Sequence, residues 1–159
     1  MPIRSLLAVL MFLIGQAPAA ALDVEDFPMA GMVVLETPHA FSELVSRVEQ
    51  AITDHKMGLV TQASASVGAA GRGVTIPGNR IVGVFRPDFA VRMLAASLPA
   101  GVEAPLRFYL VENADGKSAL AYRKPSAVFA PYGSDELDRL AEELDPIFSG
   151  IAAQAAASR

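Results

Sequence analysis

Cysteine is absent from all 159 residues of the chain. Without it the protein can form no disulfide, thiolate nucleophile, thiolate metal site or covalent haem attachment. Positive charge is also scarce, because 13 Lys and Arg residues stand against 17 Asp and Glu residues and give a formal net charge of −4. Nucleic-acid-binding domains are usually strongly basic. We therefore expect no thiol chemistry and no nucleic-acid partner.

Long apolar runs are few, and the clearest one is at the N-terminus. Residues 5–15 (SLLAVLMFLIG) are apolar and uncharged, but this stretch is shorter than the ~20 residues that a membrane helix requires. A short basic segment precedes it, and Ala19 and Ala21 follow with the spacing of a signal-peptidase site. The pattern predicts a secretory signal at residues 1–21, with an uncleaved anchor as the alternative. We expect a periplasmic or secreted protein with no membrane span after cleavage.

Hydrophobic periodicity along residues 22–159 predicts a single domain, with a core at about 29–151 and a frayed Ala-rich C-terminal tail. Strand patterns occur at 29–36, 59–66, 80–85, 105–112 and 117–123, and helical patterns occur within 39–58, 89–98 and 134–151. Gly58 is expected to end the first helix at its C′ position. An Asp-Gly link between the last two strands is typical of a hairpin. This order indicates an α+β two-layer sandwich, with a four- to five-stranded mixed or antiparallel sheet and helices on one face.

Three blocks of sequence follow one another with a distinctive spacing. They are ETPHAFSELVSRVEQAITDHKMGLV, NRIVGVFRPDFAVRML and APLRFYLVENADGKSALAYRKPS. The first combines a Thr-Pro strand end, an amphipathic helix after a Phe and a Gly before the next strand. The second combines a strand, a Pro and a helix, and the third a Pro-led strand with an Asp-Gly hairpin. Together, over about residues 29–132, they resemble the family called domain of unknown function 302 (DUF302).

The resemblance implies a small α+β fold with a tendency to dimerise, and it implies no established reaction or catalytic residue. Several positions depart from the family pattern. Phe85 and Leu106 stand where many members carry Cys, Arg86 replaces the Asn of an Asn-Pro pair, and Lys124 replaces the Asp of a later Asp-Pro pair. A thiol-based role is therefore excluded for this chain.

The two histidines do not form a metal site. His39 and His55 flank the first predicted helix, which at ~1.5 Å per residue would hold them roughly 24 Å apart. We interpret His39 as a loop or cap residue and His55 as a partner of the helix dipole. No HxxxH or HExxH spacing occurs in the sequence. We expect no metal and no other cofactor.

Other catalytic patterns are missing as well. The sequence has no GxSxG elbow around a serine. The acids of residues 134–149 are interpreted as one solvated helix face, rather than the facing carboxylates of a glycosidase. The glycines between 68 and 78 lack the Gly-Lys-Ser/Thr of a phosphate-binding loop. They predict a flexible loop that can border a pocket.

Basic residues concentrate in residues 80–124, whereas 134–149 is acidic. Two surfaces that are solvated separately would explain this asymmetry, and so would a weakly basic cleft for an acidic metabolite. In 105–112, large side chains occupy both alternating sets of positions. One sheet face must pack on helices, so the other is free to meet a ligand or a second subunit. The candidate ligand-binding residues are Arg86, Arg107, Tyr109 and Tyr122.

Arg86 stands at a strand-to-helix junction, where free backbone N–H groups and the helix dipole favour an anion. Asp88, however, is placed to cap that helix, and Arg86 can pair with its carboxylate. Pro87 favours an extended Arg86 and ends the strand. We therefore interpret Arg86 as mainly structural and keep anion contact as its second role.

Two functions remain open at this point. The first is an exported, non-catalytic module that binds a small ligand or partner protein and forms a homodimer through a sheet face or edge. The second is an enzyme without metal or thiol, which would use Tyr109, Tyr122, an Arg and an acid on a small acidic metabolite. A bare apolar sheet face would favour binding, and a closed cavity with a buried Arg–acid–Tyr set would favour catalysis.

Export with cleavage near Ala21 can be tested by mass. The intact mass of protein recovered from the export compartment should match a chain that begins near Leu22, because signal peptidase cuts after a small-x-small pattern. Exported protein that retains residues 1–15 would contradict the prediction.

Overall fold

A computed structural model describes residues 21–158 of the chain. The strands are β1 (Met32–Thr37), β2 (Gly58–Ala63), β3 (Asn79–Phe85), β4 (Leu106–Glu112) and β5 (Ser118–Arg123). The α-helices are α1 (Phe41–Asp54), α2 (Ala65–Ala70), α3 (Pro87–Ala96), α4 (Pro125–Phe129) and α5 (Asp135–Ala156). Short 3₁₀ turns are η1 (Val24–Asp26), η2 (Leu98–Glu103) and η3 (Ala130–Tyr132). The predicted signal falls almost entirely outside the described residues.

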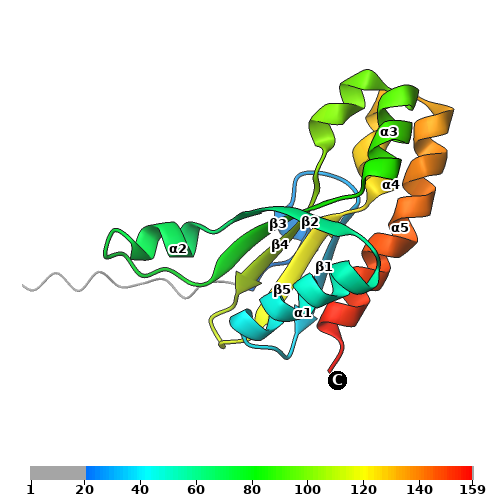
Figure 1. Cartoon of the computed structure of the whole chain (residues 1–159). Coiled ribbons are helices and arrows are strands. Elements are labelled where there is room, and N and C mark those ends of the chain that lie inside the picture. The colour runs from blue at the N-terminus through cyan, green and yellow to red at the C-terminus, as the bar shows by residue number, and fades with distance from the viewer. Residues whose placement is uncertain (1–20, 159) are drawn as a thin grey trace, which may run out of the picture.

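The five strands form one sheet in the order β1-β5-β4-β3-β2, and every neighbouring pair is antiparallel. Helices α1 and α5 pack against each other on one face of the sheet, and α2 projects from the sheet on an arm (Figure 1). This confirms the predicted α+β sandwich and fixes the sheet as five-stranded and antiparallel. Within residues 21–158, every helix is too short or too polar to cross a bilayer.

The core lies between the sheet and its helices. Phe108 of β4 stacks on Phe148 of α5 with 5.1 Å between ring centroids, and Tyr122 of β5 packs 5.3 Å from Phe108. Offset or tilted aromatic pairs of this kind stabilise a core beyond the area that they bury. These rings join the hairpin β4–β5 to α5.

Helix α1 ends differently from the sequence prediction. Lys56, not Gly58, takes the left-handed C′ conformation, with φ of 57°. The Met57 N–H donates to the Ile52 carbonyl and the Lys56 N–H to the Thr53 carbonyl, which is the pattern of a Schellman motif. The motif turns Met57 into the core, where it is 8% exposed. Burial of Met57 outweighs the cost of a non-glycine residue at positive φ, so the prediction of Gly58 as C′ was wrong.

The Ala-rich end of the chain is also more ordered than predicted. Helix α5 continues through Pro146 to Ala156, and Ala152 and Ala155 are buried. The expected fraying after residue 151 was therefore wrong. Small alanine side chains leave room for α5 to pack on α1 over its last turns.

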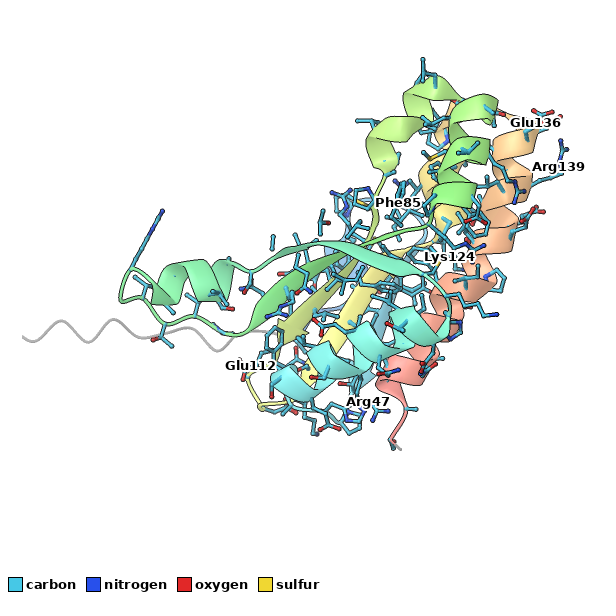
Figure 2. All side chains as sticks on the ribbon, in the orientation of Figure 1. Arg47, Phe85, Glu112, Lys124, Glu136 and Arg139 are labelled. Carbon is cyan, nitrogen blue, oxygen red and sulfur yellow. The ribbon has the colours of Figure 1, made fainter. Side chains whose placement is uncertain are left out.

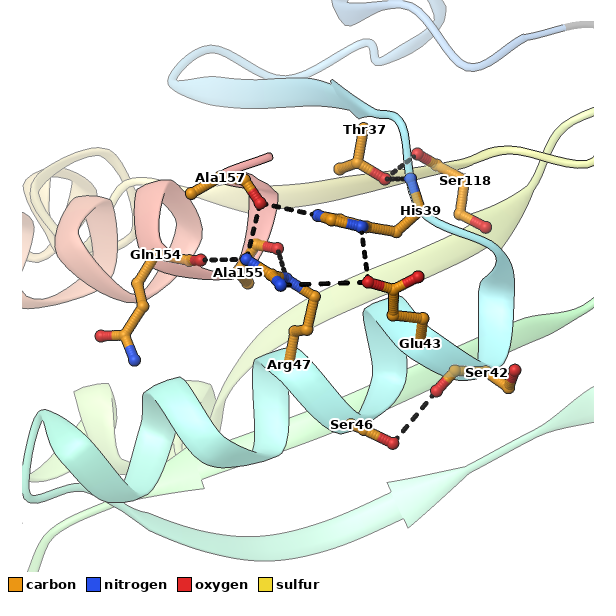
Figure 3. Close-up of polar contacts among 10 residues, drawn as sticks. All are labelled: Thr37, His39, Ser42, Glu43, Ser46, Arg47, Ser118, Gln154, Ala155 and Ala157. Carbon is orange, nitrogen blue, oxygen red and sulfur yellow. Dashed lines mark hydrogen bonds and ion pairs between the residues drawn. The ribbon is translucent and has the colours of Figure 1, made fainter. Parts of the chain in front are cut away.

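Two side chains, one just before α1 and one halfway along it, bond the last carbonyls of α5 (Figure 3). The Arg47 Nε–H donates to the Ala155 carbonyl at 2.8 Å, and an Nη2–H donates to the Ala157 carbonyl at 2.6 Å. His39 is 5% exposed, and its ring lies between the Ala157 carbonyl and the Glu43 carboxylate, 2.8 Å and 2.9 Å away. The orphan carbonyls that every helix C-terminus leaves are thus satisfied from another element.

Truncation of Phe148 should show how much the aromatic stack contributes. Phe148→Ala is expected to lower the free energy of unfolding by about 3–5 kcal/mol, because a buried Phe leaves a cavity that relaxes only in part. Leu98→Ala is the control, since Leu98 is 76% exposed and its loss should change stability by less than about 0.5 kcal/mol. Denaturant unfolding measures both, and equal losses would contradict the assignment of the core.

Candidate functional site

Helices α1 and α5 cover one face of the sheet, and we call the other face the open face. Its position follows from the cross-strand register, because residues paired directly across strands share a face. One row across the sheet consists of Val34, Ala121, Tyr109 and Ile81. Val82 and Leu110 occupy the alternate positions and point into the core, where both are fully buried.

The open face is hollowed at one end, with a volume of about 440 Å³. Sheet residues that line the hollow include Met32, Ile81, Arg107, Tyr109 and Arg123, and Phe27 and Met29 line it from the segment before β1. Glu103, at the end of η2, lines it near α4. The hollow is therefore mainly apolar, with two guanidinium groups and one carboxylate.

The predicted ligand-binding residues do not all lie together. Arg107 and Tyr109 both line the hollow. Tyr122 touches its margin, but the Tyr122 ring is stacked in the core and the residue is only 4% exposed. Burial raises the pKa of Tyr122, and the nearby Asp145 carboxylate adds to the effect. Arg86 lies elsewhere, at the start of α3.

Arg86 is engaged by its own helix. Its Nε–H and Nη2–H donate to the two carboxylate oxygens of Asp88 at 2.7 Å and 3.0 Å, and its guanidinium lies 4.1 Å from the centroid of the Phe89 ring. The N-cap is Arg86 itself and Pro87 begins the helix, so the expectation that Asp88 is the N-cap was wrong. Asp88 instead lies in the first turn, where its charge suits the dipole. This pairing supports the structural interpretation of Arg86.

Two charged residues of the hollow, Arg123 and Glu103, were not among the candidates. Arg123 lies beside Arg107 on the neighbouring strand, and Glu103 accepts a hydrogen bond of 2.9 Å from the Tyr132 hydroxyl. The hydrogen bond to Glu103, and burial in second place, raise the pKa of Tyr132. The register of the Asp-Gly hairpin could have identified Arg123 from the sequence, whereas no local pattern indicates that η2 and η3 approach each other.

A second groove, between α3 and α5, is occupied by ion pairs. Arg92 binds both carboxylate oxygens of Glu143 at 2.8 Å and 2.6 Å, and Arg139 pairs with Glu136 at 3.4 Å. Figure 2 shows Glu136 and Arg139 at the outer surface of the molecule. The positive and negative groups of this groove satisfy one another, so it offers little to a charged ligand.

The histidines and acids of the described residues form no metal site. No group of three or more of these side chains between residues 21 and 158 could hold a metal ion. His39 is bonded within the fold, and the His55 ring packs against Gly150, where an added Cβ would lie 2.5 Å from a ring carbon. Both histidines hold α5 in place.

Replacement of Arg86 gives a titration test of its role. The Arg86 hydrogen bonds lower the pKa of Asp88. The pair therefore stabilises the fold above the ordinary pKa of Asp, and this contribution is lost as the pH falls through the lowered value. Arg86→Ala should raise the pKa of Asp88 toward its ordinary value, as followed by NMR of the carboxyl carbon. Stabilisation by phosphate or sulfate in wild type that Arg86→Ala abolishes would instead show an anion site.

Comparison with known proteins identifies the family of the chain. The family model for the domain of unknown function DUF302 matches residues 33–155. No curated protein matches. Among solved structures, the uncharacterized conserved DUF302 protein from Bacillus stearothermophilus is similar, with a TM-score of 0.71 and 16% identity over 79% of this chain and 98% of that one. At that identity the likeness shows the fold alone. Because the family model covers most of the described residues, the chain belongs to the DUF302 family.

Proposed function

We propose that the protein is an exported, non-catalytic module that binds a small ligand in the hollow of the open face. The observation that carries this proposal is the hollow itself, whose volume of about 440 Å³ lies within the roughly 300–1,000 Å³ typical of ligand sites. Exposed apolar side chains beside convergent polar groups are the usual composition of such a site. The N-terminal sequence pattern supports export.

The geometry gives less support to an enzyme. Tyr109 and Tyr122 project to opposite faces of the sheet, so they cannot act together on one substrate. Tyr132 and Glu103 do form a polar pair, and Glu103 shares the hollow with Arg107, but a tyrosine hydroxyl is protonated near neutral pH and the raised pKa of Tyr132 makes it a still poorer general base. The hollow is also open to solvent, whereas acid–base chemistry gains from a closed site.

A second copy of the chain is the competing occupant of the open face. A homodimer through the edge of β2 is less favourable, because the register of β2 shifts between Leu59 and Thr61, and such bulges blunt an edge strand. A homodimer that uses the open face would bury the hollow. A ligand and a second copy of the chain would thus compete for the same surface.

Native mass spectrometry of protein purified from its export compartment distinguishes them. We expect a retained small molecule, in a monomer or in a homodimer that leaves the open face free. Ile81→Glu should no longer carry the small molecule, because Ile81 lines the hollow and is 41% exposed. Val67→Glu is the matched control, since Val67 lies on α2 outside the hollow and is 65% exposed.

A ligand-free dimer that Ile81→Glu dissociates and Val67→Glu leaves intact would show that a second copy of the chain, and not a ligand, occupies the open face. A monomer that neither retains nor binds any small molecule at the open face would contradict the proposal altogether.

A further inference from the structure

Two arginines face each other on the open face. In the β4–β5 ladder Phe108 pairs with Tyr122, so Arg107 and Arg123 occupy the next opposed position. The paired residues of β4 and β5 end at Phe108 and Tyr122, and on their outer sides Arg107 pairs with Gly83 of β3 and Arg123 with Met32 of β1. Like charges at directly opposed positions destabilise a sheet. An anion bound between the two guanidinium groups would remove that repulsion.

These arginines differ from most others in the part of the chain that the structure describes. Carboxylate partners are present for Arg47, Arg80, Arg86, Arg92 and Arg139. Between residues 21 and 158, neither Arg107 nor Arg123 has an ion pair, and the one hydrogen bond made by their side chains runs from the Arg123 Nε–H to the Ala30 carbonyl at 3.0 Å. Donors on both guanidinium groups are therefore left for a ligand. Arg72 also has no such partner there, but it lies beyond α2 and faces no second arginine.

The rest of the hollow determines what kind of anion fits. Met29 and Ile81 are 46% and 41% exposed and offer apolar contact beside the guanidinium groups. Glu103 is the acid that lines the hollow, and it would repel a second negative charge on the ligand. The surroundings therefore favour one acidic group attached to an apolar body over an inorganic or multiply charged anion.

We propose that the hollow binds an organic carboxylate with an apolar body. Its carboxylate lies between Arg107 and Arg123, and its body covers Ile81 and contacts Met29. Guanidinium groups pair with carboxylates through two parallel hydrogen bonds, which gives both affinity and orientation. This assignment rests on the proposed function, because it names the class of ligand for the same hollow.

Calorimetric titration of the mature protein with octanoate, 1-octanol and acetate tests the assignment. Octanoate should bind most tightly, because it alone combines an apolar chain with a carboxylate. Arg107→Gln and Arg123→Gln should each weaken octanoate binding about tenfold, the usual effect of one lost charge-assisted hydrogen bond. Both variants should leave octanol binding unchanged. Arg72→Gln is the matched control and should leave both ligands unaffected.

The outcomes separate the ligand class from the binding site. Equal affinity for octanoate and octanol, octanoate binding that the double variant retains, or acetate binding as tight as octanoate would overturn the assignment. Any of these, with binding still sensitive to Ile81→Glu, would leave the open face as the site. Failure of octanoate and octanol alike to bind would overturn the assignment, and it would contradict the proposed function as well only if the purified protein also retained no small molecule. If a glutamine variant does not fold, Arg107→Lys takes its place in the titration. It should also weaken octanoate binding, because lysine keeps the charge without the forked pair of donors.

Discussion

Side chains alternate between the two faces of an antiparallel sheet, and the helices of a two-layer fold cover only one of them. In β4 this alternation sends Phe108 and Leu110 to the helices and Arg107 and Tyr109 to the open face. Core and candidate site are thus built from alternate residues of the same strand. A shift of one residue in strand register would exchange the two sets. Packing of the core therefore also fixes which polar groups reach the hollow.

The hairpin β4–β5 was the most predictable part of the molecule. Its turn is closed by a 2.8 Å hydrogen bond from the Asn113 N–H to the Lys117 carbonyl, and Gly116 takes a positive φ of 80° that suits glycine. A turn at this place sets Arg107 opposite Arg123 and Phe108 opposite Tyr122. The sequence alone is therefore enough to place Tyr122 on the core face, opposite to Tyr109, although both tyrosines were candidate ligand-binding residues.

Other features depended on contacts between distant elements, which local patterns do not encode. The hydrogen bond between Tyr132 and Glu103 exists because η2 and η3 meet beside the sheet. The Ala-rich end of α5 had no sequence signal for order, since its anchors are His39 and Arg47, more than a hundred residues earlier. The end of α1 also depends on a tertiary contact, because burial of Met57 determines that Lys56 takes the left-handed conformation. Periodicity predicts which face of an element is apolar, but it does not predict its partner.

The order of the strands has a consequence for how the chain is made. β1 is the first strand in the sequence but pairs with β5, whose partner residues run from Ser118 to Arg123. Most of the chain must therefore be synthesised before β1 can pair with β5. Helix α1 can pack on α5 only after still more residues have been made. Long-range pairing of this kind slows folding relative to local contacts. The sheet can therefore take in its first strand only after the local hairpin β4–β5 is available.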